Sequence, residues 1–317
     1  MSIELLIANL TNPPLLFFIL GLVAVMVKSD LEIPAQSVKF ISLYLLFSIG
    51  FKGGQELAHE QIGIETIMTM GLGLLAAGVI PLYTFFLLKG KLGPYNAGAI
   101  AATYGSVSAV TFVAAASFLE NKGEHFGGHL VATMAMMEAP AIVVAIILMR
   151  RYAQDSTSNT VKKDILHSLT NGSVLLILGS LSIGLIADSK GAEGIKPFTT
   201  DIFKGFLAIF LLEMGMVTAR RIRSALNYGL VVTSTAIVLP LVNGCLMAVI
   251  SHAVTSSSAD RFMLSVLAAS GSYIAVPAAM KLAAPKADPG LYLPMALGLT
   301  FPFNLTMGLP IYYYFAQ

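Results

Sequence analysis

Long apolar stretches alternate along the chain with short connections that contain glycine, proline or charged residues. A helix that crosses the hydrocarbon core of a bilayer needs about 20 predominantly apolar residues. The pattern therefore predicts an all-α membrane protein with ten transmembrane helices. We place these helices at residues 14–29, 34–52, 62–88, 94–118, 126–150, 168–188, 199–219, 225–252, 260–284 and 290–315.

The longest polar connection runs from Arg150 to His167 and divides the apolar stretches into two sets of five. Short motifs recur in the same order in both sets, and Glu138-Ala139-Pro140 corresponds to Thr300-Phe301-Pro302. An odd number of spans makes the second copy insert upside down, as in the inverted repeats of secondary transporters. We therefore expect inverted five-helix repeats at 1–152 and 168–317, joined by a cytoplasmic linker at 153–167.

The fourth and ninth predicted helices carry polar residues near their centres. Ala101 to Thr111 contains one glycine and several hydroxyl side chains, and Ala268 to Pro277 has the same character. Because a helix rises 1.5 Å per residue, both stretches are expected near the bilayer midplane. Gly105 and Gly271 are expected to permit a sharp turn in a broken helix. The alternative is that these small residues only let neighbouring helices pack closely.

A broken helix frees backbone groups inside the membrane. The second half-helix starts with free amides and about half a positive charge, which favours an anion. The carbonyls that end the first half-helix, together with nearby hydroxyls, suit a small hard cation such as Na⁺. Pro277 is expected early in its half-helix, where no amide partner is needed. Two such breaks at corresponding positions predict the binding site of a secondary transporter.

Composition agrees with a lipid environment, because only 11% of the 317 residues are charged and 56% are hydrophobic. Soluble domains carry roughly 25% charged residues. The net charge of +2 argues against a nucleic-acid partner. No GxxxxGK[ST] motif, paired acids or histidine-rich motif is present, so we expect neither a primary pump nor an enzyme, no cofactor, and no metal other than Na⁺.

Basic residues predict the orientation. Thirteen lysines and arginines fall on one predicted side of the membrane and six on the side shared by both termini. We therefore expect a multi-pass protein of the bacterial inner membrane with both termini outside.

Glu138 lies near the centre of the fifth predicted helix, beside Pro140. A carboxylate at this depth costs at least ~2.5 kcal/mol on insertion scales, so it is a functional candidate. We consider two roles: it holds or exchanges a cation during transport, or it makes a buried structural hydrogen bond. Asn304, in the corresponding region of the other repeat, is a further candidate.

The stretch from Gly105 to Glu120 resembles the glycine- and serine-rich break of the sodium-dependent bicarbonate transporters of cyanobacteria. Residues 268–277 and 308–317 are similar to the second break and the C-terminus of that family. The resemblance implies crossed broken helices in spans 4 and 9, a core domain that moves against a gate domain, and a homotrimer. It also implies Na⁺-coupled bicarbonate uptake and a PII-like regulator on the cytoplasmic side.

This chain departs from the family pattern at three places. Tyr273 replaces an acidic residue of the second break, Ala109 replaces a glycine, and the central loop is much shorter. The first change bears on ion coupling and on the substrate.

We predict uptake of bicarbonate or a similar small anion with Na⁺ by alternating access. The alternatives are transport of another organic anion, proton-coupled exchange, or a membrane sensor that does not transport. Besides these two ions and the homotrimer, membrane lipids are expected partners. The predicted substrate-binding residues are Gly105, Ser106, Val107, Ser108, Gly271, Ser272 and Tyr273. The predicted sodium-binding residues are Thr103, Ser108, Thr111, Glu138, Ser270 and Asn304.

Overall fold

A computed structural model describes residues 11–59, 63–153 and 172–317, and these residues contain helices and no strand. The predicted linker at 153–167 lies, apart from Ala153, outside the described residues. The α-helices are α2 (Pro13–Met26), α3 (Ala35–His59), α4 (Ile64–Gly105), α5 (Ala109–Glu120), α6 (His129–Ala153), α8 (Gly172–Ile186), α9 (Ser189–Lys196), α10 (Phe203–Asn227), α11 (Leu230–Ser251), α12 (Ser258–Ala269), α13 (Ala275–Ala283), α14 (Pro289–Pro294), α15 (Phe301–Phe303) and α16 (Leu309–Ala316). Three π-helical segments complete the list: η1 (Pro197–Asp201), η2 (Met295–Thr300) and η3 (Asn304–Gly308).

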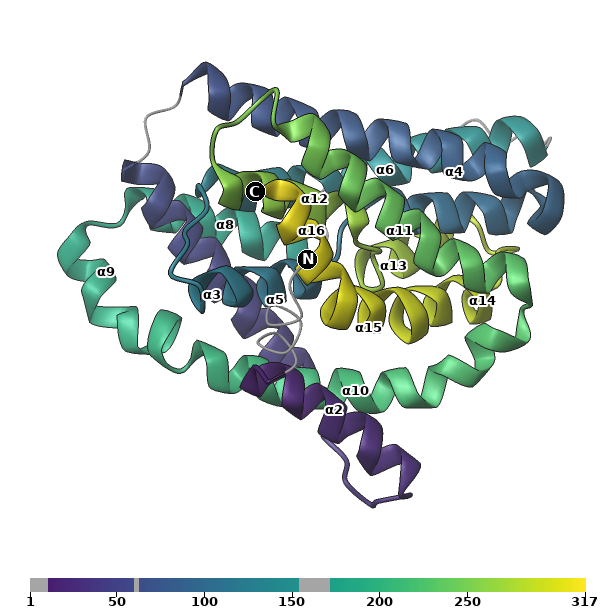
Figure 1. Cartoon of the computed structure of the whole chain (residues 1–317), viewed down its shortest axis with the longest axis horizontal. Helices are drawn as coiled ribbons and strands as arrows, with labels where there is room; N and C mark the ends of the chain where they lie inside the picture. Colours follow the sequence, from purple (N-terminus) through teal and green to yellow (C-terminus); the bar gives the residue numbers. More distant parts are fainter. Residues whose placement is uncertain (1–10, 60–62, 154–171) are drawn as a thin grey trace.

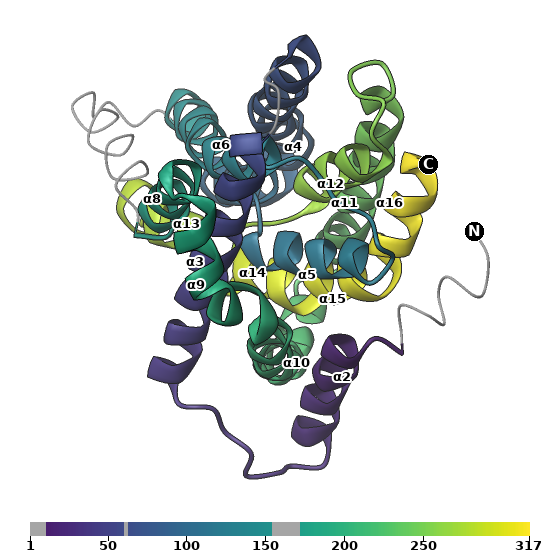
Figure 2. The same ribbon diagram turned by 90° about the vertical axis from the view of Figure 1, so that its left-hand side faces the viewer.

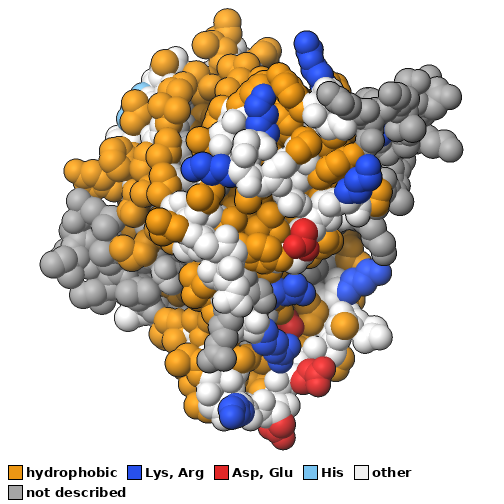
Figure 3. Space-filling view, turned by 90° about the vertical axis from the view of Figure 1, so that its right-hand side faces the viewer, with side chains coloured by type: hydrophobic (Ala, Val, Ile, Leu, Met, Phe, Trp, Pro, Cys, Tyr) orange, Lys and Arg blue, Asp and Glu red, His pale blue; other side chains and the backbone are white. Residues whose placement is uncertain are grey.

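Several helices are long and apolar enough to cross a membrane. These are Ile64–Glu120, His129–Ala153, Ser189–Ile222 and Leu230–Ser251, and Pro13–Met26 and Val174–Ile186 are shorter apolar helices. Large apolar side chains also lie on the outside, as Leu75 is 62% exposed and Leu246 is 55% exposed. Figure 3 shows hydrophobic side chains over much of one face, with basic side chains set among them. These observations fit a helical membrane protein, and the number of ten spans stays a prediction.

The helices that the sequence places first and second in each half pack in crossed pairs. α2 lies along α10, and α3 lies along α8 (Figures 1 and 2). The second of these pairs also contacts α6. Glycines make the first approach close, because a Cβ on Gly21 would overlap the carbonyl oxygen of Leu212, and one on Gly215 would overlap that of Phe18. Such small-residue contacts let membrane helices approach backbone to backbone.

The second pair repeats this arrangement. A Cβ on Gly54 of α3 would overlap the carbonyl oxygen of Leu181, and one on Gly184 of α8 would overlap that of Phe51. Glycine-lined contacts thus join the helices within each pair, and α3 packs against α10 to join the two pairs into one layer.

Gly93 divides the long α4. Its φ of 75° lies in the left-handed region that favours glycine, and Pro94 follows it. The predicted boundary between the third and fourth spans therefore falls at a sharp change of backbone direction. α4 contains the third predicted span and the first half of the fourth.

Three elements meet at the end of the molecule that carries this bend. The Lys286 Nζ donates to the Tyr95 hydroxyl at 3.1 Å, and the Tyr228 hydroxyl donates to an Asp288 carboxylate oxygen at 2.7 Å. The bond from Tyr228 to Asp288 raises the pKa of Tyr228 because it stabilises the protonated phenol. The end of α10, the start of α14 and the second half of α4 are thereby fixed together.

Candidate functional site

The first interruption separates α4 from α5. α4 ends at Gly105, and Ser106 and Ser108 have extended backbones before α5 begins at Ala109. The Ser108 hydroxyl caps α5, because its oxygen accepts from the Thr111 amide at 3.2 Å and from the Thr111 hydroxyl at 2.9 Å. Serine is a preferred N-cap residue for this reason. The residues from Ser106 to Ser108 therefore follow the end of α4 and provide the N-cap of α5.

The second interruption separates α12, which ends at Ala269, from α13, which begins at Ala275. The residue before α13, Ile274, has no side-chain group that can cap the helix. The Ser272 hydroxyl approaches the Val276 amide at 3.4 Å, which is long for a hydrogen bond. Pro277 is the third residue of α13, so the predicted early position of this proline is confirmed.

The two interruptions contact one another directly. The Ser272 amide donates to the carbonyl oxygen of Thr103 at 2.8 Å. In the other direction, the Ser108 amide donates to the Ser270 hydroxyl at 2.9 Å, and that hydroxyl donates to the carbonyl oxygen of Leu267. Each break thus satisfies a backbone group of the other. This exchange joins segments more than 160 residues apart in the sequence.

A small cavity lies where the two second half-helices begin. It is lined by Leu46, Val107, Ser108, Ala109, Glu138, Ser272, Tyr273 and Ile274. The N-terminal ends of α5 and α13 therefore share one cavity, as the two breaks predicted. Among the described residues, no acceptor is present for the amides of Ala109 and Val110 in the first turn of α5. The cavity is electropositive on its backbone side and suited to an anion.

Glu138 brings the acidic group to this cavity. It lies on α6 and is only 6% exposed. One of its carboxylate oxygens, Oε2, is buried without a hydrogen-bond donor among the described residues, and no described lysine or arginine forms an ion pair with it. The Ser106 hydroxyl is also buried without a partner among the described residues, and the buried Tyr273 hydroxyl makes only a poorly formed contact with the Ser108 side chain. A buried, unpaired carboxylate needs a cation or a proton to neutralise it.

The remaining predicted residues lie around the cavity in different ways. Thr103 and Ser270 hold the two breaks together through the bonds described above, and Thr111 bonds Ser108 within the first break. The side chain of Thr103 donates to the carbonyl oxygen of Ala99 in its own helix. Asn304 does not line the cavity, and it donates to the carbonyl oxygen of Ala269 at 2.8 Å.

The predicted reason for the two glycines is wrong. Among the described residues, positive φ occurs at Lys28, Gly93, Gly123 and Gly229, so neither Gly105 nor Gly271 has the turn conformation that requires glycine. Position 105 instead requires a glycine because a Cβ there would overlap the ring of Pro81. A Cβ on Gly271 would meet its nearest neighbour, the Tyr104 ring, at an ordinary 3.5 Å.

Sequence reasoning missed two residues near the breaks. The Tyr104 hydroxyl, at the end of α4, is hydrogen-bonded to the Thr300 hydroxyl at 2.7 Å. Thr300 belongs to the Thr300-Phe301-Pro302 motif, which corresponds to the motif of Glu138 in the other half. The correspondence between these two motifs is the sequence signal that could have identified Thr300.

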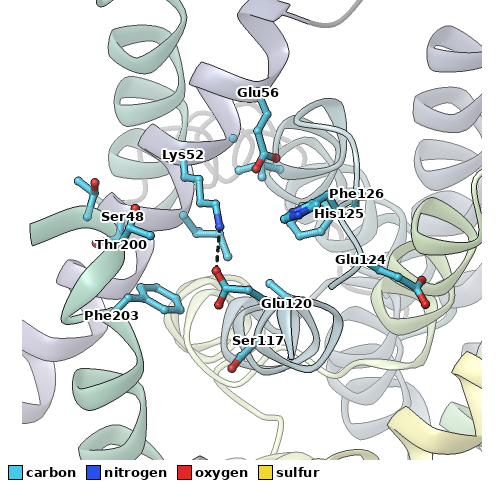
Figure 4. Close-up of a pocket in the computed structure, with 15 residues that line it drawn as sticks. Ser48, Lys52, Glu56, Ser117, Glu120, Glu124, His125, Phe126, Thr200 and Phe203 are labelled. Atoms are coloured by element: carbon cyan, nitrogen blue, oxygen red, sulfur yellow. Dashed lines mark hydrogen bonds and ion pairs between the residues drawn. The ribbon is translucent and has the colours of Figure 1, made fainter. Parts of the chain in front are cut away.

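A larger cavity lies farther along α3 and α5, between these helices and the start of α10 (Figure 4). Here the Glu120 carboxylate is bracketed by the Lys52 Nζ at 3.2 Å and the Lys204 Nζ at 3.3 Å. Leu46 lines the small cavity, and Ser48 and Ile49, which follow it on α3, line the larger one. The two cavities are thus neighbours along α3.

Two interrupted helices that meet at a shared cavity are a feature typical of membrane transporters. The comparison with protein families makes this specific. The chain belongs to the Na⁺-dependent bicarbonate transporter superfamily, whose model matches residues 13–317. This confirms the resemblance drawn from the two breaks and identifies a multi-pass membrane transporter. No curated protein matches the chain.

Proposed function

We propose that this protein is a secondary active transporter that takes up bicarbonate, or a similar small anion, together with Na⁺ by alternating access. The observation that carries this proposal is the cavity where α5 and α13 both begin and where Glu138 lies. Two helix N-termini attract an anion without a buried basic side chain. The carboxylate and the surrounding oxygens offer the hard ligands that Na⁺ prefers.

The substrate anion is proposed to bind at residues of both breaks, where amides and hydroxyls converge. These residues are Gly105, Ser106, Val107, Ser108, Gly271, Ser272 and Tyr273. Na⁺ is proposed to bind beside it, with Glu138 supplying the charge. The proposed sodium site comprises Thr103, Ser108, Thr111, Glu138, Ser270 and Asn304.

Alternating access is proposed to occur between the layer of α2, α3, α8 and α10 and the helices that carry the breaks. The two glycine-lined contacts support an inverted repeat, because the pair α2–α10 is the counterpart of the pair α8–α3 under exchange of the halves. Lys52 on α3 and Lys204 on α10 hold Glu120 on α5, so these ion pairs join the layer to a broken helix. Such partly exposed pairs are worth about 0–1 kcal/mol each, which makes them easy to open.

The proposal includes the remaining features of the fold. We infer ten spans in two inverted repeats, both termini outside the bacterial inner membrane, and a homotrimer in contact with membrane lipids. The grouping of Lys286, Tyr95, Tyr228 and Asp288 at one end supports a shared side for these loops. A PII-like regulator would approach from that cytoplasmic side.

Uptake of labelled bicarbonate into proteoliposomes tests this function. We expect uptake that depends on an inward Na⁺ gradient, and we expect Glu138→Gln to lower the Na⁺-dependent rate by at least about tenfold, since each tenfold is ~1.4 kcal/mol. Glu213→Gln on α10 is the matched control, because Glu213 does not line the cavity. Unchanged Na⁺-dependent uptake by Glu138→Gln would contradict the assigned role.

The unpaired carboxylate of Glu138 also favours a second candidate, proton-coupled transport of an organic anion. A proton neutralises a buried carboxylate as well as a cation does. An imposed pH gradient without Na⁺ separates the two, because it drives uptake only in the proton-coupled case. Anion binding without flux under either gradient would identify a sensor instead.

A further inference from the structure

The helical run from α14 to α16 is interrupted by two π-helical turns, η2 and η3. Thr300 ends the first turn and Asn304 begins the second, and each side chain is only 1% exposed. π-helical turns are rare and change the direction in which side chains point, and they occur frequently at functional sites. Here they place two polar side chains, four residues apart, inside the core.

Thr300 contacts the half-helix that precedes the first break. Its hydroxyl donates to the carbonyl oxygen of Ala236 on α11 at 2.6 Å. Because a threonine hydroxyl has one proton, it must accept the hydrogen bond that joins it to the Tyr104 hydroxyl at 2.7 Å. Tyr104 directly precedes Gly105, the last residue of α4. The chain of bonds therefore fixes the end of α4 to α11.

Asn304 contacts the half-helix that precedes the second break. Its Nδ2 donates to the carbonyl oxygen of Ala269, the last residue of α12, at 2.8 Å. A helix ends with carbonyls that have no partner in the helix, and in a membrane water cannot replace it. The Asn304 Oδ1 accepts from the Tyr312 hydroxyl at 2.8 Å. Both polar atoms of this amide are therefore engaged away from the cavity.

The anchor of Asn304 is itself fixed in place. The Tyr312 ring is fully buried, and it lies so close to Gly308 that a Cβ there would come within 3.0 Å of the ring. Asn304 is thus held between a rigid aromatic anchor and the end of α12. Thr300 has an equivalent anchor in the backbone of α11.

We propose that Thr300 and Asn304 are positioning residues that set the relative placement of the two broken helices, and through them the geometry of the ion site. Asn304 acts through the Ala269 carbonyl and does not itself ligate Na⁺. The proposal rests on the function proposed above and changes the role of one residue within it. The physical reason is that a shift of either half-helix end would move Thr103, Ser270 and their bonded partners together.

Asn304→Asp separates positioning from ligation. Ionised aspartate keeps an oxygen where Na⁺ would bind and keeps the acceptor for Tyr312, but it loses the donor to Ala269, so uptake is measured at alkaline pH, where this carboxyl is not protonated. If Asn304 positions the helix, the Na⁺ concentration for half-maximal uptake rises by roughly tenfold, since a buried carbonyl loses its donor. If Asn304 ligates Na⁺, that concentration stays the same or falls, and the proposal is overturned.

Two further variants keep the proposal testable if Asn304→Asp does not fold. Thr300→Val removes the hydroxyl at nearly constant volume and is expected to raise the half-maximal Na⁺ concentration by several-fold to tenfold, while Thr300→Ser restores it. Thr306→Val is the matched control on the same helical run, because its hydroxyl donates to the Pro302 carbonyl of that run. Wild-type Na⁺ dependence in Thr300→Val, or no rescue by Thr300→Ser, would overturn the proposal.

The outcomes also distinguish this inference from the proposed function. If the wild-type protein shows no Na⁺-dependent uptake, the function fails and the inference fails with it. If the wild-type protein shows Na⁺-dependent uptake and Asn304→Asp or Thr300→Val keeps the wild-type Na⁺ dependence, only the inference fails.

Discussion

The two helix interruptions differ in how completely each satisfies its own backbone. In the first, Ser108 caps α5 through its hydroxyl, and three residues connect the half-helices. In the second, five residues connect the half-helices, Ile274 supplies no cap, and Ser272 makes only a 3.4 Å contact with α13. The start of α5 is capped by a local hydrogen bond, whereas the start of α13 has no comparable cap, and both breaks also depend on the bonds that they exchange with each other.

This difference indicates that the two breaks have different roles in the cavity. A break that is locally capped keeps its shape without a ligand, so the first provides a fixed wall of the cavity. The second lacks such a cap at the start of α13, so a bound ion or anion can complete it.

The largest expected difference between the breaks is in their glycines. Gly105→Ala should destabilise the protein by about 1–3 kcal/mol, because the new methyl group overlaps the Pro81 ring. Gly271→Ala should change stability by less than about 0.5 kcal/mol, because its Cβ has ordinary contact distances. Thermal unfolding of the detergent-solubilised protein compares the two. Equal losses would show that the second break is packed as tightly as the first.

Both breaks could be located from the sequence, because glycine and hydroxyl residues in the middle of an apolar stretch are unfavourable in a continuous membrane helix. The sequence also placed Glu138 and Ser272 in one region, since both lie near the centre of their predicted spans. It could not supply the partners of these groups. The bond from the Ser108 amide to the Ser270 hydroxyl depends on tertiary packing across the whole chain.

The interpretation of Gly105 failed for a related reason. Glycine in a break suggests a positive φ, but the need for a small residue came from Pro81, on the same helix and 24 positions earlier. The π-helical turns at Thr300 and Asn304 were also not predicted, because the apolar stretch at 290–315 reads as one continuous helix in the sequence.

An intermediate effect is expected from the capping serines. Ser108→Ala should cost about 1 kcal/mol, because it removes the N-cap of α5 and the acceptor for the Thr111 hydroxyl. Ser272→Ala should cost less than half of this, since its contact with Val276 is at the limit of a hydrogen bond. Both variants should nevertheless transport more slowly. If Ser272→Ala is the more damaging to stability, the second break is the better capped of the two, and the comparison is reversed.

The smallest effect on stability is expected from Tyr273→Phe. The Tyr273 hydroxyl is buried and has only a poorly formed contact with the Ser108 side chain, while its ring packs edge-on against Phe301 with centroids 6.0 Å apart. Removing a poorly bonded hydroxyl and keeping the ring should leave stability within about 0.5 kcal/mol of wild type, or raise it slightly. If the second break waits for a ligand, the same change should weaken anion uptake several-fold, because the lost hydroxyl is one of the groups that the ligand satisfies. A loss of stability greater than about 1 kcal/mol, the net energy of one hydrogen bond, would mean that the hydroxyl is already bonded and that the second break is complete.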